Sequence, residues 1–205
     1  MSKREEKLSL EAQHLRRIDP ILGSIITENL PPLTGVRTVY EDLLSSIISQ
    51  QLSVKAAASI ERKFLTLWKG LFPKPDTLLK ATDEKLRSAG LSRQKIEYMR
   101  SMATHFKEHS LDKKNFHSMK DTEIMETLLP IKGVGTWTVE MLLMFTIKHP
   151  DVFSVKDLGL VNGVCKLYNL KKTKTLSKRI LKLSKKWSPY KTTASRYIWR
   201  YKDAK

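Results

Sequence analysis

Two glycines, Gly133 and Gly135, stand between two stretches in which apolar residues recur with helical spacing. Because glycine has no Cβ, a turn built from it can bring backbone N–H groups close to another molecule. A helix starting at about Thr136 would add N–H groups without intrahelical partners and the positive end of its dipole. The pattern is typical of a phosphate-binding turn, although a simple turn between two helices explains it equally well.

A dinucleotide-binding loop also contains Gly-x-Gly, but two features argue against one here. That loop follows a β-strand and carries a third glycine three residues after the second. In this chain a helical pattern precedes Gly133, and Thr138 stands at the third position. A phosphate held at this turn would therefore belong to a different kind of ligand.

The charge of the chain indicates which kind of phosphate-containing ligand it binds. Lys and Arg number 38 against 21 Asp and Glu, which gives a formal net charge of +17. Residues 171–205 hold 13 of the basic residues and one acid, Asp203. A folded domain this basic repels itself unless a polyanion offsets the charge, so nucleic acid is the favoured partner. A solvated helix face is the alternative interpretation of the charged run.

Length and composition exclude several protein classes. With 205 residues, 40% of them hydrophobic, the chain can bury a core as one domain or as two closely fused halves. It has no run of 18 apolar residues, and its first seven residues are too charged for a signal sequence. Cys165 is the single cysteine, which excludes an intramolecular disulfide and a cysteine metal cage. We expect an intracellular protein that does not span a membrane.

The hydrophobic period predicts an all-α protein of roughly nine to eleven short helices, because strand-like alternation is not visible. Ser53 is a good N-cap, so two helices are expected to meet at Gln51–Ser53. A helix is expected over 77–89, and another from Asp121 to Leu129. Ser188 and Pro189 are expected to be the N-cap and first residue of the last helix.

Several motifs in this chain resemble the alkylpurine DNA glycosylases of the helix-hairpin-helix superfamily, the DNA-3-methyladenine glycosylase II type. They are residues 131–145 continued by 151–160, together with 47–57, 89–95 and 187–200, and the resemblance covers about residues 40–202. It implies a compact all-α fold of two helical halves, with an active-site cleft between them. It also implies a single domain over 1–205 with the hairpin at about 128–146, in which the N-terminal segment and the C-terminal helices form one half.

The resemblance places the catalytic aspartate of the family on Asp157. Taken alone, this residue is more typical of an N-cap ahead of Leu158, but its position 20 residues after Trp137 allows the chain to bring the carboxylate back beside the hairpin. The sequence departs from the family at two neighbouring positions, with Ser154 where proline is common and Lys156 where a second acid is common. Loss of the proline would loosen the loop, and Lys156 could pair with Asp157 or with phosphate.

The implied reaction needs little more than a carboxylate and access to the sugar. An alkylated purine is cationic and leaves as a neutral base, so one carboxylate can stabilise the sugar cation and orient water. The nucleotide must first be flipped out of the duplex. Aromatic walls suit a cationic base, and Trp137 and Tyr190 match the pocket positions of the family. For Trp199, plain packing of an amphipathic helix is the favoured interpretation.

Other family positions carry DNA contacts. The hairpin residues Lys132, Gly133, Val134, Gly135 and Thr136 are expected to bind phosphate. The turn Gln51, Leu52 and Ser53 corresponds to the segment that relatives insert as a wedge into the base stack, although a plain helix junction also explains it.

Trp137 occupies the position at which strand-cutting relatives carry a Schiff-base lysine, so we expect a monofunctional glycosylase. No cofactor or metal is expected, apart from a structural Na⁺ or K⁺ at the hairpin when DNA is bound. Duplex DNA with alkylated bases is the expected partner of a monomer, in the cytoplasm of a prokaryote or the nucleus of a eukaryote. A non-enzymatic DNA-binding protein, or a glycosylase for another damaged or mismatched base, are the alternatives.

Overall fold

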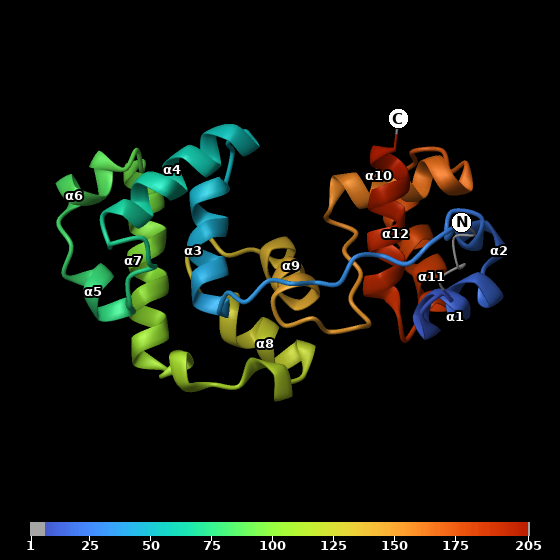
Figure 1. Cartoon of the computed structure of the whole chain (residues 1–205), viewed down its shortest axis with the longest axis horizontal. Coiled ribbons are helices and arrows are strands. Elements are labelled where there is room, and N and C mark those ends of the chain that lie inside the picture. Colours follow the sequence, from blue (N-terminus) through green and yellow to red (C-terminus); the bar gives the residue numbers. More distant parts are fainter. Residues whose placement is uncertain (1–6, 205) are drawn as a thin grey trace, which may run out of the picture. The chain divides into compact units, whose positions relative to one another are not determined.

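A computed structural model of the chain describes residues 7–204. Within that range every regular element is a helix, and no β-strand occurs (Figure 1). The predicted all-α class is confirmed. The charged residues 1–6 and Lys205 lie outside the described part of the chain. Among residues 7–204 no helix is both long and apolar enough to cross a membrane.

The described chain forms twelve α-helices and three short 3-10 helices, one more α-helix than the upper limit expected from the sequence. Very short helices account for the excess, because a single turn leaves too few residues to show a period. The α-helices, with the 3-10 helices at Leu111–Lys113, Phe116–Ser118 and Lys185–Trp187, are α1 (Leu10–Ile18), α2 (Pro20–Gly23), α3 (Val39–Ser49), α4 (Val54–Thr66), α5 (Pro75–Leu79), α6 (Asp83–Ser88), α7 (Arg93–Glu108), α8 (Asp121–Leu128), α9 (Thr136–Phe145), α10 (Leu158–Tyr168), α11 (Leu176–Ser184) and α12 (Lys191–Asp203).

Two compact units make up the chain. The middle unit comprises residues 35–142, and the terminal unit comprises the residues up to 34 together with 143–205. In the middle unit, α7 buries Ile96, Met99, Met102 and Phe106, the apolar stripe visible in its sequence. The hydroxyl of Ser53 caps α4 by accepting a hydrogen bond from the backbone N–H of Ala56, as predicted.

Two predicted helix boundaries are wrong. The helix expected over 77–89 is two helices, α5 and α6, because the Thr82 hydroxyl accepts the N–H of Lys85 and begins a new helix. The last helix begins at Lys191 instead of Pro189, and Tyr190 is its N-cap. Ser188 does not cap it, because its hydroxyl donates to Asp151 at 2.6 Å.

The terminal unit is organised around a buried carboxylate. Asp19 is 5% exposed and caps α2 by accepting the N–H groups of Ile21 and Leu22. Its other oxygen accepts the Tyr168 hydroxyl at 2.7 Å and the Trp187 indole N–H at 3.0 Å. A buried carboxylate is costly unless it is fully hydrogen-bonded. The bonds from Tyr168 and Trp187 therefore join Asp19 to α10 and to the segment before α12.

Candidate functional site

The hairpin turn between α8 and α9 requires glycine at one of its two positions. Gly133 has a φ of +84°, and a Cβ added there would lie 2.3 Å from the ring of Tyr98. Its carbonyl accepts a hydrogen bond from the side-chain amide of Gln50 at 2.9 Å. Backbone conformation and packing therefore both exclude a side chain at Gly133.

Gly135 differs from Gly133, which corrects the expectation that both glycines make the turn. It is absent from the residues with positive φ, and an added Cβ would meet nothing within 4 Å. The fold therefore does not need glycine here. The open space over Gly135, directly before α9, would let a phosphate group come close to the backbone.

The N-terminus of α9 follows the turn directly, and the first N–H groups of a ten-residue helix have no intrahelical partner. Lys132, predicted to contact phosphate, is paired with Glu97. The hydrogen bond from Lys132 lowers the pKa of Glu97, and the same bond raises the pKa of Lys132. Because both side chains are exposed, the pair is weak and Lys132 can exchange Glu97 for a phosphate.

A cavity of about 430 Å³, lined mostly by residues with polar side chains, lies beside the hairpin in the middle unit. It brings together predicted site residues from two separate motifs, Gln51 from one and Gly133 and Trp137 from the other. Trp137 is 42% exposed, so its ring is available to a ligand. Sequence reasoning did not name the other polar residues of this lining as site residues, although most of them lie in the motifs at 47–57 and 89–95; they are Ser46, Ser49, Gln50, Ser92, Gln94, Lys95 and Tyr98.

The predicted wedge segment protrudes in a strained conformation. Gln51 has a φ of +57°, which is uncommon for a residue other than glycine, and Leu52 is 38% exposed. The Nζ of Lys95 donates to the Ile48 carbonyl, and burial lowers the pKa of this amine. Together with the Gln50–Gly133 bond, this contact holds the end of α3 in place.

Asp157 is the N-cap of α10, as the alternative interpretation of this residue proposed. Its Oδ1 accepts the backbone N–H of Leu160 at 2.6 Å and the indole N–H of Trp199 at 2.9 Å. The carboxylate is therefore oriented by both a helix terminus and a side chain from α12. Capping does not exclude catalysis, since it fixes the position of a group that a reaction can use.

Trp199 is the residue near Asp157 whose role the sequence did not reveal. Its ring packs 5.6 Å from that of Phe145, which agrees with the packing role predicted for it, but its N–H also binds the carboxylate. The two residues are 42 positions apart, and neither lies in a motif that specifies the other. Gly159 leaves room for the pair, since a Cβ there would stand 3.2 Å from Asp157 Oδ1.

The loop before Asp157 is held without the proline of the family. Ser154 is fully buried, and its hydroxyl accepts the N–H of Lys156. Lys156 itself is exposed and forms no ion pair with Asp157 among the described residues.

Burial raises the pKa of Asp151, but hydrogen bonds from Lys191 and Ser188 outweigh the effect of burial and lower this pKa overall. The contribution of Asp151 to stability is thus present at neutral pH and is lost only as the pH falls through the lowered value.

Tyr190, predicted as the second wall of the base pocket, is the N-cap of α12 and is partly buried. Its ring meets His14 edge-on at 5.3 Å. Asp157 and Tyr190 belong to the terminal unit, whereas the hairpin, Trp137 and the wedge segment belong to the middle unit.

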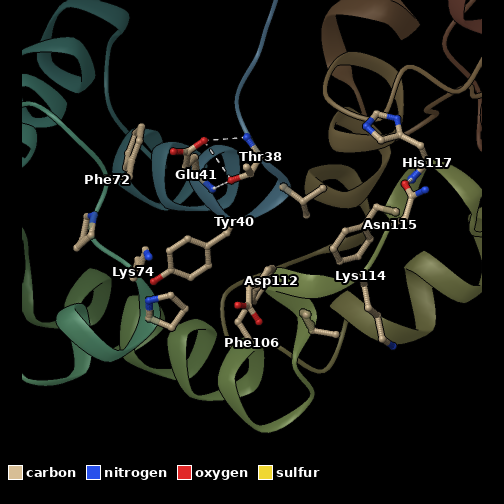
Figure 2. A pocket seen from close by; sticks show the side chains of 15 residues that line it. Thr38, Tyr40, Glu41, Phe72, Lys74, Phe106, Asp112, Lys114, Asn115 and His117 are labelled. Atoms are coloured by element: carbon tan, nitrogen blue, oxygen red, sulfur yellow. Dashed lines mark hydrogen bonds between the residues drawn. The ribbon is translucent and has the colours of Figure 1, made fainter.

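A second cavity of the middle unit, of about 370 Å³, contains none of the predicted site residues. Figure 2 shows Tyr40 in the middle of its lining, next to the capping pair Thr38 and Glu41. Burial raises the pKa of Tyr40, so its hydroxyl stays neutral. The cavity lies at the start of α3, and the wedge segment follows the end of that helix, about 16 Å away along its axis. It is therefore separate from the candidate DNA contacts.

No group of three or more His, Cys, Asp or Glu side chains in residues 7–204 is placed to hold a metal ion. The chain offers instead a carboxylate, aromatic rings and a helix N-terminus behind an open backbone turn. Such groups can stabilise a cation, stack on a base and bind a phosphate.

Comparison with known proteins agrees with this set of groups. Residues 44–189 match the HhH-GPD superfamily of base excision DNA repair proteins. A Saccharomyces cerevisiae DNA-3-methyladenine glycosylase is 32% identical over 99% of this chain and 73% of its own length. A Bacillus subtilis relative is also 32% identical, and the chain spans 64% of its length.

Two solved structures are similar over nearly the whole chain. A DNA-3-methyladenine glycosidase from Bacillus halodurans has a TM-score of 0.84 and 36% identity, with 96% of this chain and 90% of that chain covered. A 3-methyladenine DNA glycosylase of Schizosaccharomyces pombe, in complex with abasic DNA, has a TM-score of 0.77 and 31% identity, with 94% and 96% covered.

Proposed function

Because the chain belongs to the HhH-GPD superfamily of base excision DNA repair proteins, we propose that it removes alkylated purines from duplex DNA. The substrates are bases of the 3-methyladenine and 7-methylguanine type, and the reaction hydrolyses the N-glycosidic bond to leave an abasic site. The observation that carries the proposal is the carboxylate of Asp157, oriented by Leu160 and Trp199. The similar glycosylase bound to abasic DNA, the product of such a reaction, supports it.

In the proposed mechanism, the negative charge of Asp157 stabilises the sugar cation that forms when the glycosidic bond breaks. An N3- or N7-alkylated purine carries a positive charge that it loses when the glycosidic bond breaks, so no general acid is required. Positive charge then develops on the sugar, and a carboxylate stabilises it and orients the attacking water. The hydrogen bonds to Oδ1 keep the carboxylate in one position throughout.

The middle unit supplies the DNA contacts in this proposal. The hairpin from Lys132 to Thr136 binds phosphate through backbone N–H groups and the dipole of α9. The segment Gln51–Ser53 occupies the space of the flipped nucleotide. Phosphate contacts position the duplex without reading its sequence, so damage is recognised in the base pocket. The exposed ring of Trp137 is proposed to stack on the damaged base, and Tyr190 of the terminal unit stays the second wall predicted from the sequence.

Trp137→Ala should lower the rate of base release and leave binding to undamaged duplex unchanged. The loss of stacking, about 1–3 kcal/mol, corresponds to roughly a 5- to 150-fold lower rate on 7-methylguanine DNA. Because the ring is 42% exposed, the melting temperature should stay close to that of the wild type. Reduced melting temperature together with reduced affinity for undamaged duplex would show that Trp137 is a packing residue.

Incubation with methylated duplex DNA tests the proposed function directly. Free 3-methyladenine or 7-methylguanine should appear in chromatography, and the DNA strand should stay intact until it is treated with alkali or heat. Trp137 occupies the position of the Schiff-base lysine, so borohydride should trap no protein–DNA adduct. A trapped adduct would refute the hydrolytic mechanism, and release of an oxidised base alone would assign a different lesion.

The hairpin can also hold the monovalent cation predicted for the DNA complex. Its carbonyls at Ile131 and Gly133 each accept one hydrogen bond, and a carbonyl oxygen has a second lone pair to offer a cation. A bound Na⁺ or K⁺ would attract phosphate and take no part in bond cleavage.

Each copy of the chain contains every residue that the proposal uses, so we expect the protein to excise bases as a monomer.

A further inference from the structure

The terminal unit carries a concentration of charge that the proposed excision chemistry does not use. We call it the basic surface; it consists of eight exposed residues, Lys171, Lys172, Lys174, Lys178, Arg179, Lys182, Lys185 and Lys186. No Asp or Glu occurs between residues 171 and 186. None of the eight pairs with a carboxylate in the described chain, whereas Lys191, Arg200 and Lys202 of α12 each do.

The fold keeps these charges on one side of α11. Leu176, Ile180 and Ser184 are the buried positions of this helix and pack into the terminal unit. Lys178, Lys182 and Lys185 follow one another at spacings of four and three residues, so they lie in a row along the exposed side. The part of the basic surface on α11 is thus a row of charges on a helix that packs into the terminal unit, not a disordered tail.

Helix α10 separates the first part of the basic surface, the loop from Lys171, from the candidate catalytic carboxylate. Asp157 caps the start of α10, and the lysine-rich loop from Lys171 follows its end at Tyr168 (Figure 1). Eleven residues at 1.5 Å each place the two about 16 Å apart along the helix axis. The end of the basic surface that begins at Lys171 therefore lies about a helix length from Asp157.

We propose that the basic surface binds the phosphate backbone of duplex DNA outside the damaged nucleotide. The proposal rests on the proposed function, since it takes the substrate to be duplex DNA. The surface raises the affinity for any duplex and contributes nothing to bond cleavage. Electrostatic contacts of this kind are independent of sequence and let a protein slide along DNA, which suits a search for rare lesions.

The residue types favour DNA over an acidic protein. Seven of the eight residues are lysine, a point charge that binds phosphate and is depleted in protein–protein interfaces. Such interfaces also need large apolar or aromatic anchors, and Leu181 is the one exposed large hydrophobic residue on α11. A row of lysines without anchors matches a row of phosphates better than a folded partner.

Two variants of equal charge test the proposal. The first replaces Lys178, Lys182, Lys185 and Lys186 with glutamine, and the control replaces the exposed residues Lys63, Lys69, Lys80 and Lys113 of the middle unit. Each lowers the net charge of +17 by four. A third variant with arginine at the four positions of the basic surface keeps the charge. Glutamine and arginine both favour helix, so all three should fold, which melting temperatures will verify.

The measured quantities are the Kd for an undamaged 30-base-pair duplex at several salt concentrations and the single-turnover rate of 7-methylguanine release at saturating protein. The first variant should bind at least about tenfold more weakly at low salt, with a salt slope reduced by about 0.9 for each lost contact. The control and the arginine variant should stay within about threefold of wild type. The rate at saturation should be unchanged in all of them.

Three results would overturn the proposal. Equal losses in the first variant and the control would show that only net charge matters. Wild-type binding by the first variant would show that the surface does not contact DNA. A lower saturating rate at unchanged melting temperature would place the surface in the excision site. Absence of base release by the wild type would refute the proposed function, and the binding measurements would still decide about the basic surface.

Discussion

Asp157→Asn should lower the rate of base release by roughly 10²–10⁴-fold, the range associated with one positioned acid–base or charged group. Asparagine is as good an N-cap as aspartate and retains an oxygen for the N–H groups of Leu160 and Trp199. The substitution therefore removes the charge and leaves the start of α10 intact. Binding to abasic-analogue DNA should stay within about tenfold, or ~1.4 kcal/mol. Single-turnover release of 7-methylguanine is the measurement.

Two comparisons make this experiment decisive. Asp157→Ala also removes the helix cap and should cost about 0.5–2 kcal/mol of stability, which the asparagine variant should not. Trp199→Phe keeps the carboxylate and the aromatic contact with Phe145, and removes only the N–H that orients Oδ1. It should slow release by a smaller factor, roughly ten- to a hundredfold. If Asp157→Asn turned over at nearly the wild-type rate, Asp157 would be a cap alone and the proposed mechanism would be refuted.

Gly133→Ala should destabilise the fold and Gly135→Ala should leave its stability nearly unchanged, whereas both should weaken DNA binding. Alanine at Gly133 must adopt a φ of +84° and place its Cβ against the ring of Tyr98. Conformational strain of about 1–2 kcal/mol and overpacking of about 1–3 kcal/mol should both destabilise the protein. For a chain of this size the melting temperature should fall by roughly 4–20 °C. Affinity for damaged and undamaged duplex should fall together, because the hairpin contacts phosphate.

Gly135→Ala is the matched control, since its Cβ would meet nothing within 4 Å. Its stability should stay within about 1 kcal/mol of wild type, because a weaker helix cap is offset by a less flexible unfolded chain. The added methyl group stands where a phosphate would approach the backbone, so affinity for duplex should still fall. Wild-type affinity in a Gly135→Ala protein of wild-type stability would show that the hairpin backbone does not bind phosphate.

The sequence by itself determined the features that depend on neighbouring residues. The apolar period of α7 and the cap at Ser53 are local, because helix turns and caps involve partners three or four positions apart. The all-α class follows from such periods. The N-cap role of Asp157 could be predicted for the same reason, since its partner Leu160 is three residues away.

Only the tertiary structure decided the contacts between distant residues. Trp199 orients Asp157 across 42 positions, and Gln50 binds the Gly133 carbonyl across 83. Ser188 satisfies Asp151 instead of capping the last helix, because a partner 37 positions away takes its hydroxyl. The two glycines of the hairpin look alike in sequence, but only Gly133 has a positive φ and the ring of Tyr98 packed over it. Such choices depend on which side chains meet when the helices pack, and no local pattern encodes that.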